Sequence, residues 1–407
     1  MILAAVLLFQ GLAGAVGGDP NALPSAVIWL VAGVVFAVAF WWLNQNFELY
    51  NVGKETLTQA SARVAWNLLV PTLIVLVVVA LRPLEATFVA SLTDERFAAG
   101  GESEVNFVGL ENYARLISVR FDVVECTRTD GGACEVDDDG ELVFPRVRDA
   151  VTDEAYRELR FRDVSAITLG ESQLVLSARD DDFIDAIGNT LTFTFFSVLI
   201  ELILGLFIAM VINSNFTGRG IMRAAMLVPW AIPTVVSARL WEIMLRDNQS
   251  GVINHFFVNI GLLAESQAWL ASPALQIPSL VAIDVWKTTP FMALLLLAGL
   301  QTIPSDIYEA ADVDGASKVR QFFSMTLPLL RPTIAVALVF RTLDAVRVFD
   351  VFQVLLGRQR LSMATYNYET LVQSQQLGYA SAIGVVIFVI ILLFTLAYVR
   401  ILGVNTD

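Results

Sequence analysis

Four charged residues lie three positions apart in an otherwise apolar stretch of the chain. They belong to "FRTLDAVRVFDVFQVL" (340–355) and are Arg341, Asp344, Arg347 and Asp350. A charge near the centre of a bilayer costs roughly 2.5–3.5 kcal/mol on insertion scales. Four such residues must therefore pair with one another or face protein or water. Alternating signs at i,i+3 spacing permit an internal ladder of ion pairs along one side of a helix. The same side chains could also line a polar cavity for a solute, and both roles can hold together.

A second group of polar and aromatic residues interrupts the apolar run 277–301. It is the sequence "DVWKTTPF" (284–291), in which Pro290 loosens the helical backbone. Lys287 is one of three lysines in the chain and needs a partner in an apolar span. Asp284 or Asp344 could supply that partner. Trp286 and Phe291 offer flat aromatic faces, although such residues are more often lipid-facing or part of a core.

The composition places the helices that carry these residues in a lipid bilayer. Of the 407 residues, 56% are hydrophobic and 16% are charged, whereas a soluble domain has about 25% charged residues. About 20 apolar residues cross a hydrocarbon core, and backbone groups in lipid must pair within the segment. We therefore predict an all-α polytopic membrane protein with eight transmembrane helices. They lie at about 1–17, 25–43, 64–82, 187–212, 222–245, 277–301, 332–356 and 381–402.

Lysine and arginine residues in the short loops predict the orientation. With both termini in the cytoplasm, the inner side carries eight basic residues and the short outer loops carry three. The inner ones are Lys54, Arg63, Arg219, Arg223, Lys318, Arg320, Arg331 and Arg400, and the outer ones are Arg246, Arg358 and Arg360. The first run ends in "GLAGAVGG", whose small residues are typical of the end of a signal peptide. No positively charged region precedes the run, however, as a signal peptide would require. We expect a retained helix.

One outer segment, 83–186, is much longer than the others. Residues 83–185 include 24 acidic and 10 basic residues, a net charge of −14 that equals the formal charge of the whole chain. About 100 residues can bury a modest core, so we expect a small extracytoplasmic domain of mixed α/β structure between the third and fourth helices. Alternating apolar and polar residues predict short strands in "GELVFPRV" (140–147) and "AITLGESQLVLSA" (166–178).

Both cysteines of the chain, Cys126 and Cys134, lie in this outer segment, in "ECTRTDGGAC". Two cysteines around a Gly-Gly turn in an oxidising compartment predict a disulfide that closes a hairpin. Two free thiols are the alternative. A metal site is a weaker interpretation, because the one histidine, His255, is far away in the sequence, and we predict no metal.

A polar, amphipathic segment separates the sixth and seventh runs on the cytoplasmic side. Its sequence is "IYEAADVDGASKVRQFFSMTLPLLRP" (307–332). We expect a short helix ended by Gly315, then a helical turn at 316–324 with Val319, Phe322 and Phe323 on one side. Leu327-Pro328 should stop that turn before the next span begins at Pro332. Such a knob suits a groove on a cytoplasmic partner. A helix lying on lipid is the alternative, but it favours a polar face rich in lysine and arginine.

The spacing within this segment resembles the EAA loop of ABC-importer permeases. The matching residues are Glu309, Ala310, Ala311, Gly315, Leu327 and Pro328, and Met325 stands where the family more often has isoleucine. "NFVGLENY" (106–113), "GNTLTFT" (188–194) and the 340–355 stretch resemble the carbohydrate branch of that family. Eight helices with an outer insertion after the third are similar to the MalF-type subunits of maltose or trehalose importers.

This resemblance implies a domain organisation and a set of partners. Two N-terminal helices (1–63) would precede helix 3 (64–82), the acidic domain (83–186) and a permease core (187–407) with a coupling loop at 302–331. The loop would dock into a cytoplasmic ATPase dimer, which would bind the ATP and magnesium, so that this chain itself needs no cofactor. A MalG-type second permease subunit would complete the pathway in a bacterial or archaeal inner membrane, and an extracytoplasmic sugar-binding protein would deliver the solute.

The resemblance also implies which residues border the solute. The Trp286–Phe291 stretch and the middle of the seventh helix would line the pathway of a sugar, an α-linked disaccharide or maltodextrin, with another sugar or glycerol-phosphate as the alternative. The candidate residues are Trp286, Lys287, Thr288, Phe291, Arg341, Asp344, Arg347 and Asp350.

Two other classes of function account for less of the sequence. A secondary transporter would use the intramembrane charges as relays, but we find no inverted repeat, and it would leave the 307–332 segment unexplained. A membrane enzyme would need clustered histidine, cysteine or acidic ligands, and a chain with one histidine gives that class little support. No G-x-x-x-x-G-K-[ST] phosphate loop occurs. We predict a permease without catalytic residues and without a nucleic-acid partner.

Overall fold

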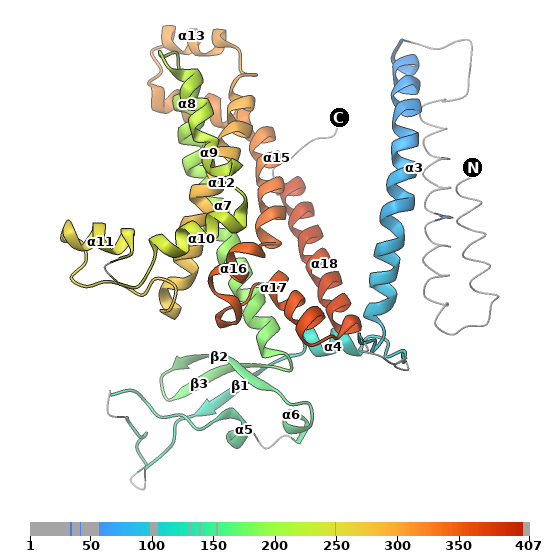
Figure 1. Ribbon diagram of the computed structural model, residues 1–407, viewed down its shortest axis with the longest axis vertical. Helices are drawn as coiled ribbons and strands as arrows, with labels where there is room; N and C mark the ends of the chain where they lie inside the picture. The colour runs from blue at the N-terminus through green and yellow to red at the C-terminus, as the bar shows by residue number, and fades with distance from the viewer. Residues whose placement is uncertain are drawn as a thin grey trace. The chain divides into compact units, whose positions relative to one another are not determined.

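The computed structural model describes residues 33–34, 41, 57–97, 105–129, 132–137, 140–151, 154–248 and 250–401. Nearly all of the first two predicted spans, 1–17 and 25–43, lies outside these residues. The described chain forms two compact units (Figure 1). One comprises Met1–Ala114 and Thr370–Val385, and the other comprises Arg115–Glu369 and Val386–Asp407.

In the first unit, helix α3 (Leu57–Ser91) contains the predicted third span and continues nine residues beyond its predicted end at 82. The segment that follows closes over the carboxyl end of this helix. Asn112 Nδ2 donates to the carbonyl oxygens of Ser91 and Thr93 at 2.8 and 2.9 Å. The backbone N–H of Asn106 donates to Asp94 Oδ1 at 2.7 Å. The "NFVGLENY" stretch thus supplies donors for carbonyls that have no partner within the helix.

The second unit begins with a three-stranded antiparallel sheet in the order β1-β3-β2. Its pairing register places Val119 opposite Ala178 and Glu125 opposite Ser172. The predicted strand region 166–178 is confirmed as the β2–β3 hairpin, whose turn contains Gly170 at φ +66°. The strand β1 was not predicted. The elements of this part are α4 (Glu111–Ile117), β1 (Val119–Glu125), α5 (Val147–Ala150), α6 (Glu154–Glu158), β2 (Arg162–Leu169) and β3 (Ser172–Ala178).

A small core holds the sheet against α5 and α6. It consists of Val124, Val147, Tyr156 and Val175. The Tyr156 hydroxyl donates to Asp163 Oδ1 at 2.7 Å, and burial raises the pKa of Tyr156 to about 12. The strand predicted at 140–147 is wrong, because in this stretch only Leu142 forms an isolated bridge, with Val136, and Val147 already begins a helix. The proline at 145 cannot donate to a ladder.

The helical body follows directly, since α7 (Asp181–Asn213) begins three residues after β3 ends. The sheet lies at one end of α7, and α8 and α13 lie at the other (Figure 1). Four helical stretches among the described residues are long and apolar enough to span a membrane, and a bent pair of helices supplies a fifth. The four stretches are Asp181–Asn213, Pro273–Leu300, Lys318–Leu355 and Leu377–Tyr398. The helices that follow α7 along the chain are α8 (Arg219–Met226), α9 (Val228–Ala231), α10 (Thr234–Met244), α11 (Val252–Asn259), α12 (Pro273–Leu300), α13 (Ser305–Val313), α14 (Lys318–Gln321), α15 (Leu327–Val346), α16 (Asp350–Leu355), α17 (Met363–Tyr368) and α18 (Leu377–Ile401).

The predicted fifth span, 222–245, is not one straight helix. The segments Arg219–Ala231 and Thr234–Met244 meet at an angle of 88°. Ile232 between them is extended, with φ −72° and ψ 130°. Pro233 follows Ile232 and disfavours the helical conformation of the residue before it. The hydrophobicity of the run hid this break.

The predicted seventh span, 332–356, also differs from the structure. Helix α15 begins at Leu327 and ends at Val346, and α16 starts only at Asp350 after an irregular Phe349 with φ −124° and ψ −61°. The predicted stop at Leu327-Pro328 is wrong as well. A π-helical turn over Phe322–Thr326 joins α14 to α15. Proline is tolerated within the first turn of a helix, where its missing N–H is not needed.

Glycine permits a close approach of helices in this body. A Cβ atom placed on Gly299 of α12 would lie 2.7 Å from Thr333 Cβ of α15. On Gly205 of α7 it would lie 3.2 Å from the backbone nitrogen of Ala293 in α12. The three helices can therefore pack tightly enough for polar side chains in their middle to reach one another.

The contact at Gly299 yields a stability prediction. Gly299→Ala should destabilise the protein by about 1–3 kcal/mol, because overpacking forces the helices apart. The matched control is Gly188→Ala in α7, where the added Cβ meets no atom within 4 Å and alanine gains about 0.5–1 kcal/mol as a better helix former. Thermal denaturation of the purified protein would measure both. Equal melting temperatures for the two variants would contradict the close approach of α12 and α15.

Candidate functional site

A buried guanidinium joins three helices in the middle of the helical body. Arg341 of α15 donates from Nη2 to Glu201 Oε1 of α7 at 3.0 Å, and its Nε donates to the other oxygen of Glu201. Nη2 also contacts Asp284 of α12, and Nη1 donates to Asp344 Oδ2 at 3.0 Å. The side chains of Arg341 and Glu201 are 3% and 0% exposed, whereas that of Asp344 is 71% exposed. We call Arg341, Glu201, Asp284 and Asp344 the charge cluster.

The hydroxyl of Thr288 completes the inner side of this cluster. It lies within hydrogen-bond distance of the Glu201 carboxylate and 2.6 Å from the carbonyl oxygen of Asp284. Taking ions out of water costs several kcal/mol each, which is offset only by close pairing and further hydrogen bonds. The bidentate contact of Arg341 with Glu201 provides that pairing.

The cluster differs from the predicted ladder along one helix. Arg341 and Asp344 do pair, but the main partner of Arg341 is Glu201, which sequence reasoning left without a role. Arg347 closes the end of α15, where its Nε donates to the carbonyl of Leu343 at 3.1 Å. Asp350 starts the next helix. Among the described residues, no ion pair joins Arg347 to Asp344 or Asp350. A lone acid in an apolar run was the one available signal for Glu201.

Lys287 has a different partner from the two aspartates considered from the sequence. Its ammonium donates to the carbonyl of Ile232 at 2.6 Å and lies 3.4 Å from that of Trp230. The carbonyl of Trp230 lies in the last turn of α9, and that of Ile232 lies in the break between α9 and α10. Within the part of the chain that the structure describes, Lys287 forms no ion pair with a carboxylate.

Aromatic residues lie one position before this lysine in α12 and one helical turn after it, and each is paired. The ring of Phe291 stacks on Trp230 at 5.7 Å with an interplanar angle of 9°. Trp286, which is partly exposed, meets Trp241 of α10 edge to face at 5.5 Å. Helix α12 thus presents two tryptophan-containing pairs toward the broken span, and flat aromatic faces suit contact with sugar rings.

The amphipathic segment forms two short helices joined at a glycine. Helix α13 ends at Val313 with Asp314 as its C-cap, and Gly315 adopts φ +71°. The N–H of Ala316 donates to the carbonyl of Ala311 at 2.9 Å, as in a Schellman motif. Ser317 then caps α14 by accepting from the N–H of Arg320. The predicted helix end at Gly315 is confirmed.

Asp312 clamps the two short helices together. Lys318 Nζ donates to its two carboxylate oxygens at 2.7 and 2.9 Å, and Gln321 Nε2 donates at 2.6 Å. These hydrogen bonds, that of Lys318 first, hold the pKa of Asp312 below its usual value. The carboxylate is therefore ionised at neutral pH.

The outer face of this segment is apolar and open. Val313, Val319 and Phe323 are exposed. Glu309 and Ala310 are also exposed, whereas Ala311 is buried. Phe322 is half-buried against Phe323, with ring centroids 4.9 Å apart. The three exposed apolar side chains leave a surface that a partner protein could cover.

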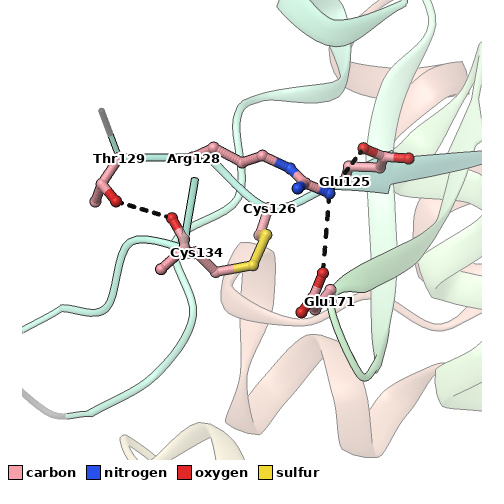
Figure 2. Close-up of a disulfide and its surroundings, with 7 residues drawn as sticks. Glu125, Cys126, Arg128, Thr129, Cys134 and Glu171 are labelled. Atoms are coloured by element: carbon pink, nitrogen blue, oxygen red, sulfur yellow. Dashed lines mark hydrogen bonds and ion pairs between the residues drawn. A yellow bond between two sulfur atoms is a disulfide. The ribbon is translucent and has the colours of Figure 1, made fainter. Parts of the chain in front are cut away.

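At the other end of the molecule, a disulfide joins Cys126 and Cys134, with their Cα atoms 5.6 Å apart. Figure 2 shows it beside Arg128, whose guanidinium lies between Glu125 and Glu171, 3.8 and 3.9 Å from their carboxylates. Glu171 and the two sulfur atoms lie within 4.8 Å of one another. Metal binding by cysteine requires a thiolate, and sulfurs bonded to each other offer none.

The charge cluster predicts an asymmetry between two variants. Arg341→Gln should cost about 3–5 kcal/mol of stability, because it leaves Glu201 and Asp284 as uncompensated buried charges. Glu201→Gln should cost less, since Arg341 keeps Asp284 and Asp344. Adding Glu201→Gln to Arg341→Gln should recover part of the loss.

The melting temperature of the purified protein would measure these effects. Arg347→Gln is the matched control, because that arginine is exposed and its guanidinium contacts only a carbonyl of its own helix. If Arg341→Gln and Arg347→Gln were equally stable, the cluster would not hold the helices together.

Comparison with known proteins identifies the family of this chain. Residues 201–403 match the model of the binding-protein-dependent transport system inner membrane component. The chain is 46% identical over 233 residues to the trehalose/maltose transport system permease protein MalF of Thermococcus litoralis, covering 56% of this chain and 76% of that protein. It is 38% identical over 227 residues to the sulfoquinovosyl glycerol transport system permease protein SmoG of Agrobacterium fabrum, covering 55% and 73%.

A solved structure agrees with these relatives. A chain of a bacterial alginate ABC transporter, in complex with an alginate pentasaccharide-bound periplasmic protein, superposes with a TM-score of 0.50 at 29% identity. The match covers 54% of this chain and 77% of that chain. Matched sequence, helical fold and candidate spans lead to one conclusion. The chain belongs to the family of inner-membrane components of binding-protein-dependent transport systems, and it is a transport protein rather than an enzyme.

Proposed function

We propose that this chain is the permease subunit of an ATP-driven sugar importer whose solute is an α-linked disaccharide or maltodextrin of the maltose or trehalose type. The observation that carries the proposal is the 46% identity to a trehalose/maltose permease over 233 residues. The aromatic pairs beside the broken span support it, because sugars bind to flat aromatic faces flanked by hydrogen-bonding groups.

The solute pathway would run beside α12 and α15. Trp286 and Phe291 would supply aromatic contacts, and the exposed carboxylate of Asp344 would accept hydrogen bonds from sugar hydroxyls. Arg347 and the half-buried Asp350 lie at the break after α15 and would contribute polar groups. Thr288 and Arg341 would support the pathway from behind, since their polar atoms are already engaged in the charge cluster.

The segment from α13 to the start of α15 would couple transport to ATP hydrolysis. Glu309, Ala310, Ala311, Gly315, Leu327 and Pro328 carry the EAA spacing, and the exposed face of Val313, Val319 and Phe323 suits a groove on an ATPase subunit. ATP and magnesium would bind to that partner pair. The clamp at Asp312 would let α13 and α14 move as one body.

The arrangement of the whole chain follows from the same assignment. We propose eight transmembrane helices with both termini in the cytoplasm. The 83–186 segment, with its disulfide, would face the outside and receive the sugar-binding protein, and a MalG-type subunit would complete the pathway. Within the second unit, the sheet and α13 lie at opposite ends of the helical body (Figure 1), which is compatible with this orientation.

A different solute is the second candidate. The 38% identity to a sulfoquinovosyl glycerol permease favours testing glycosyl glycerols and glycerol-phosphate beside disaccharides. A proton-driven transporter accounts for less, because it gives the apolar face of the amphipathic segment no partner.

The solute is tested by the ATPase activity of the reconstituted importer with its binding protein. Maltose, trehalose, a maltodextrin, a glycosyl glycerol and glycerol-phosphate would be added in turn. We expect maltose, trehalose or the maltodextrin to stimulate hydrolysis most. Stimulation by the glycerol compounds alone would establish the second candidate. If transport followed an imposed proton gradient and no ATPase copurified, the chain would not be part of an ATP-driven importer.

The coupling role is tested at Gly315. Gly315→Pro should abolish sugar-stimulated ATPase activity, because proline fixes φ near −65° where this position needs +71°. Gly315→Asn is the matched control, since asparagine tolerates the left-handed conformation, and it should retain coupling. Measured stimulation that is the same in both variants would show that the joint between α13 and α14 is not needed.

A further inference from the structure

The ammonium of Lys287 lies where the broken span would otherwise leave carbonyl oxygens without a partner. Helix α9 ends at Ala231, Ile232 is extended, and α10 begins after Pro233. The last carbonyls of a helix have no donor within it, and in the hydrocarbon region water cannot replace that donor. Lys287 reaches two of these oxygens, those of Ile232 and Trp230.

Lys287 is largely buried within the helical body. The residue is 8% exposed. Asp284, Asp344 and Asp350 act on it by longer-range attraction, and no described carboxylate pairs with it directly. A cation at the carboxyl end of a helix is also favoured by the helix dipole. Broken helices in ion-coupled transporters use such freed carbonyls to hold a sodium ion or a proton.

The same contact fixes the aromatic residues around the pathway. Lys287 and Phe291 are four residues apart and lie on one face of α12. One holds the carbonyl of Trp230, and the other stacks on its ring at 5.7 Å. Trp241 on α10, beyond the break, meets Trp286 of α12. The angle between α9 and α10 therefore determines the positions of Trp230 in α9 and Trp241 in α10 relative to α12.

We propose that Lys287 is a positioning residue, a built-in cation that holds the broken span by its free carbonyls and thereby places Trp230 and Trp241, without contacting the solute itself. This role depends on the proposed function in one respect, which is that the solute is a sugar. Lys287 is then not a ligand of the sugar. Its ammonium also takes the place that a bound inorganic cation could otherwise occupy at this break.

A single introduced cysteine can report on the break. The two native cysteines are joined to each other, so Ile232→Cys creates the one free thiol of the chain while keeping the backbone carbonyl. We would measure the rate at which a water-soluble methanethiosulfonate reagent labels this thiol in the full importer, with Lys287 intact or replaced. Loss of hydrogen bonds from a charged donor should raise the labelling rate about tenfold in Lys287→Met.

Three further variants separate charge from shape. Lys287→Arg keeps the charge and should keep the labelling rate close to that of the parent. Lys287→Ala should label rapidly, and added n-propylammonium should slow it again by restoring an ammonium to the site. Thr395→Val is the matched control for removing a polar group from a membrane helix, since its hydroxyl bonds only within α18, and it should not change labelling.

Transport kinetics distinguish positioning from direct contact. If Lys287 positions the aromatic residues, KM in Lys287→Met rises by a similar factor for every transported sugar, and the order of preference among sugars stays the same. An altered order together with unchanged labelling of Ile232→Cys would overturn the proposal and make Lys287 a solute ligand. Should Lys287→Ala fail to fold, the comparison of Lys287→Met with Lys287→Arg decides alone. The labelling needs no solute, so it stands even if no sugar stimulates the importer.

Discussion

The requirement that a buried guanidinium be neutralised governs the helical body. Arg341 is too costly to leave unpaired in a medium of low dielectric constant, and its partners come from α7, α12 and its own helix. The bidentate geometry of guanidinium and carboxylate fixes direction as well as distance. A shift of α7 along its axis by one helical turn would move Glu201 by about 5.4 Å and separate the pair. This interaction therefore helps to fix the register of α7 against α15, and the glycines at 205 and 299 permit the helix approach that it needs.

The lipid environment also explains why the broken span has a lysine beside it. Lipid supplies no hydrogen bonds, so every interruption of a helix must be satisfied by another part of the protein. At the α9–α10 break the donor is Lys287. At the π-helical turn, which lies in the proposed coupling segment, the N–H of Leu327 reaches the carbonyl of Phe322 instead, and the helix continues past Pro328. The backbone carbonyls near the two prolines thus find different donors. At Pro233 the donor is the ammonium of Lys287, and before Pro328 it is a backbone N–H of the wider π-helical turn.

Sequence reasoning succeeded where the cause of a structure is local. The end of α13 at Gly315 and the β2–β3 hairpin around Gly170 depend on a few adjacent residues, and both were predicted. The partner of Arg341 could not be predicted, because Glu201 lies 140 positions away and many registers of two apolar helices are alike in composition. The bend at Ile232 was missed since hydrophobicity alone was counted, although the prolines at 229 and 233 marked it. The first strand was missed because its partner, β3, follows some fifty residues later.

Continuity of the backbone limits how this permease can move. Strand β3 runs into α7 with two residues between them, and the π-helical turn joins α14 to α15 without a loop. Helix α7 therefore follows the sheet after two residues, and α15 continues the coupling segment, while Glu201 and Arg341 tie these two helices in their middle. A displacement of α13 and α14 would therefore reach the charge cluster through a continuous helical segment. It must appear as a movement of the cluster as a whole or be taken up where the helices are interrupted, at Ile232 and at Arg347–Phe349. Those two interruptions lie beside the residues proposed to face the solute, so motion and solute contact are confined to the same region of the fold.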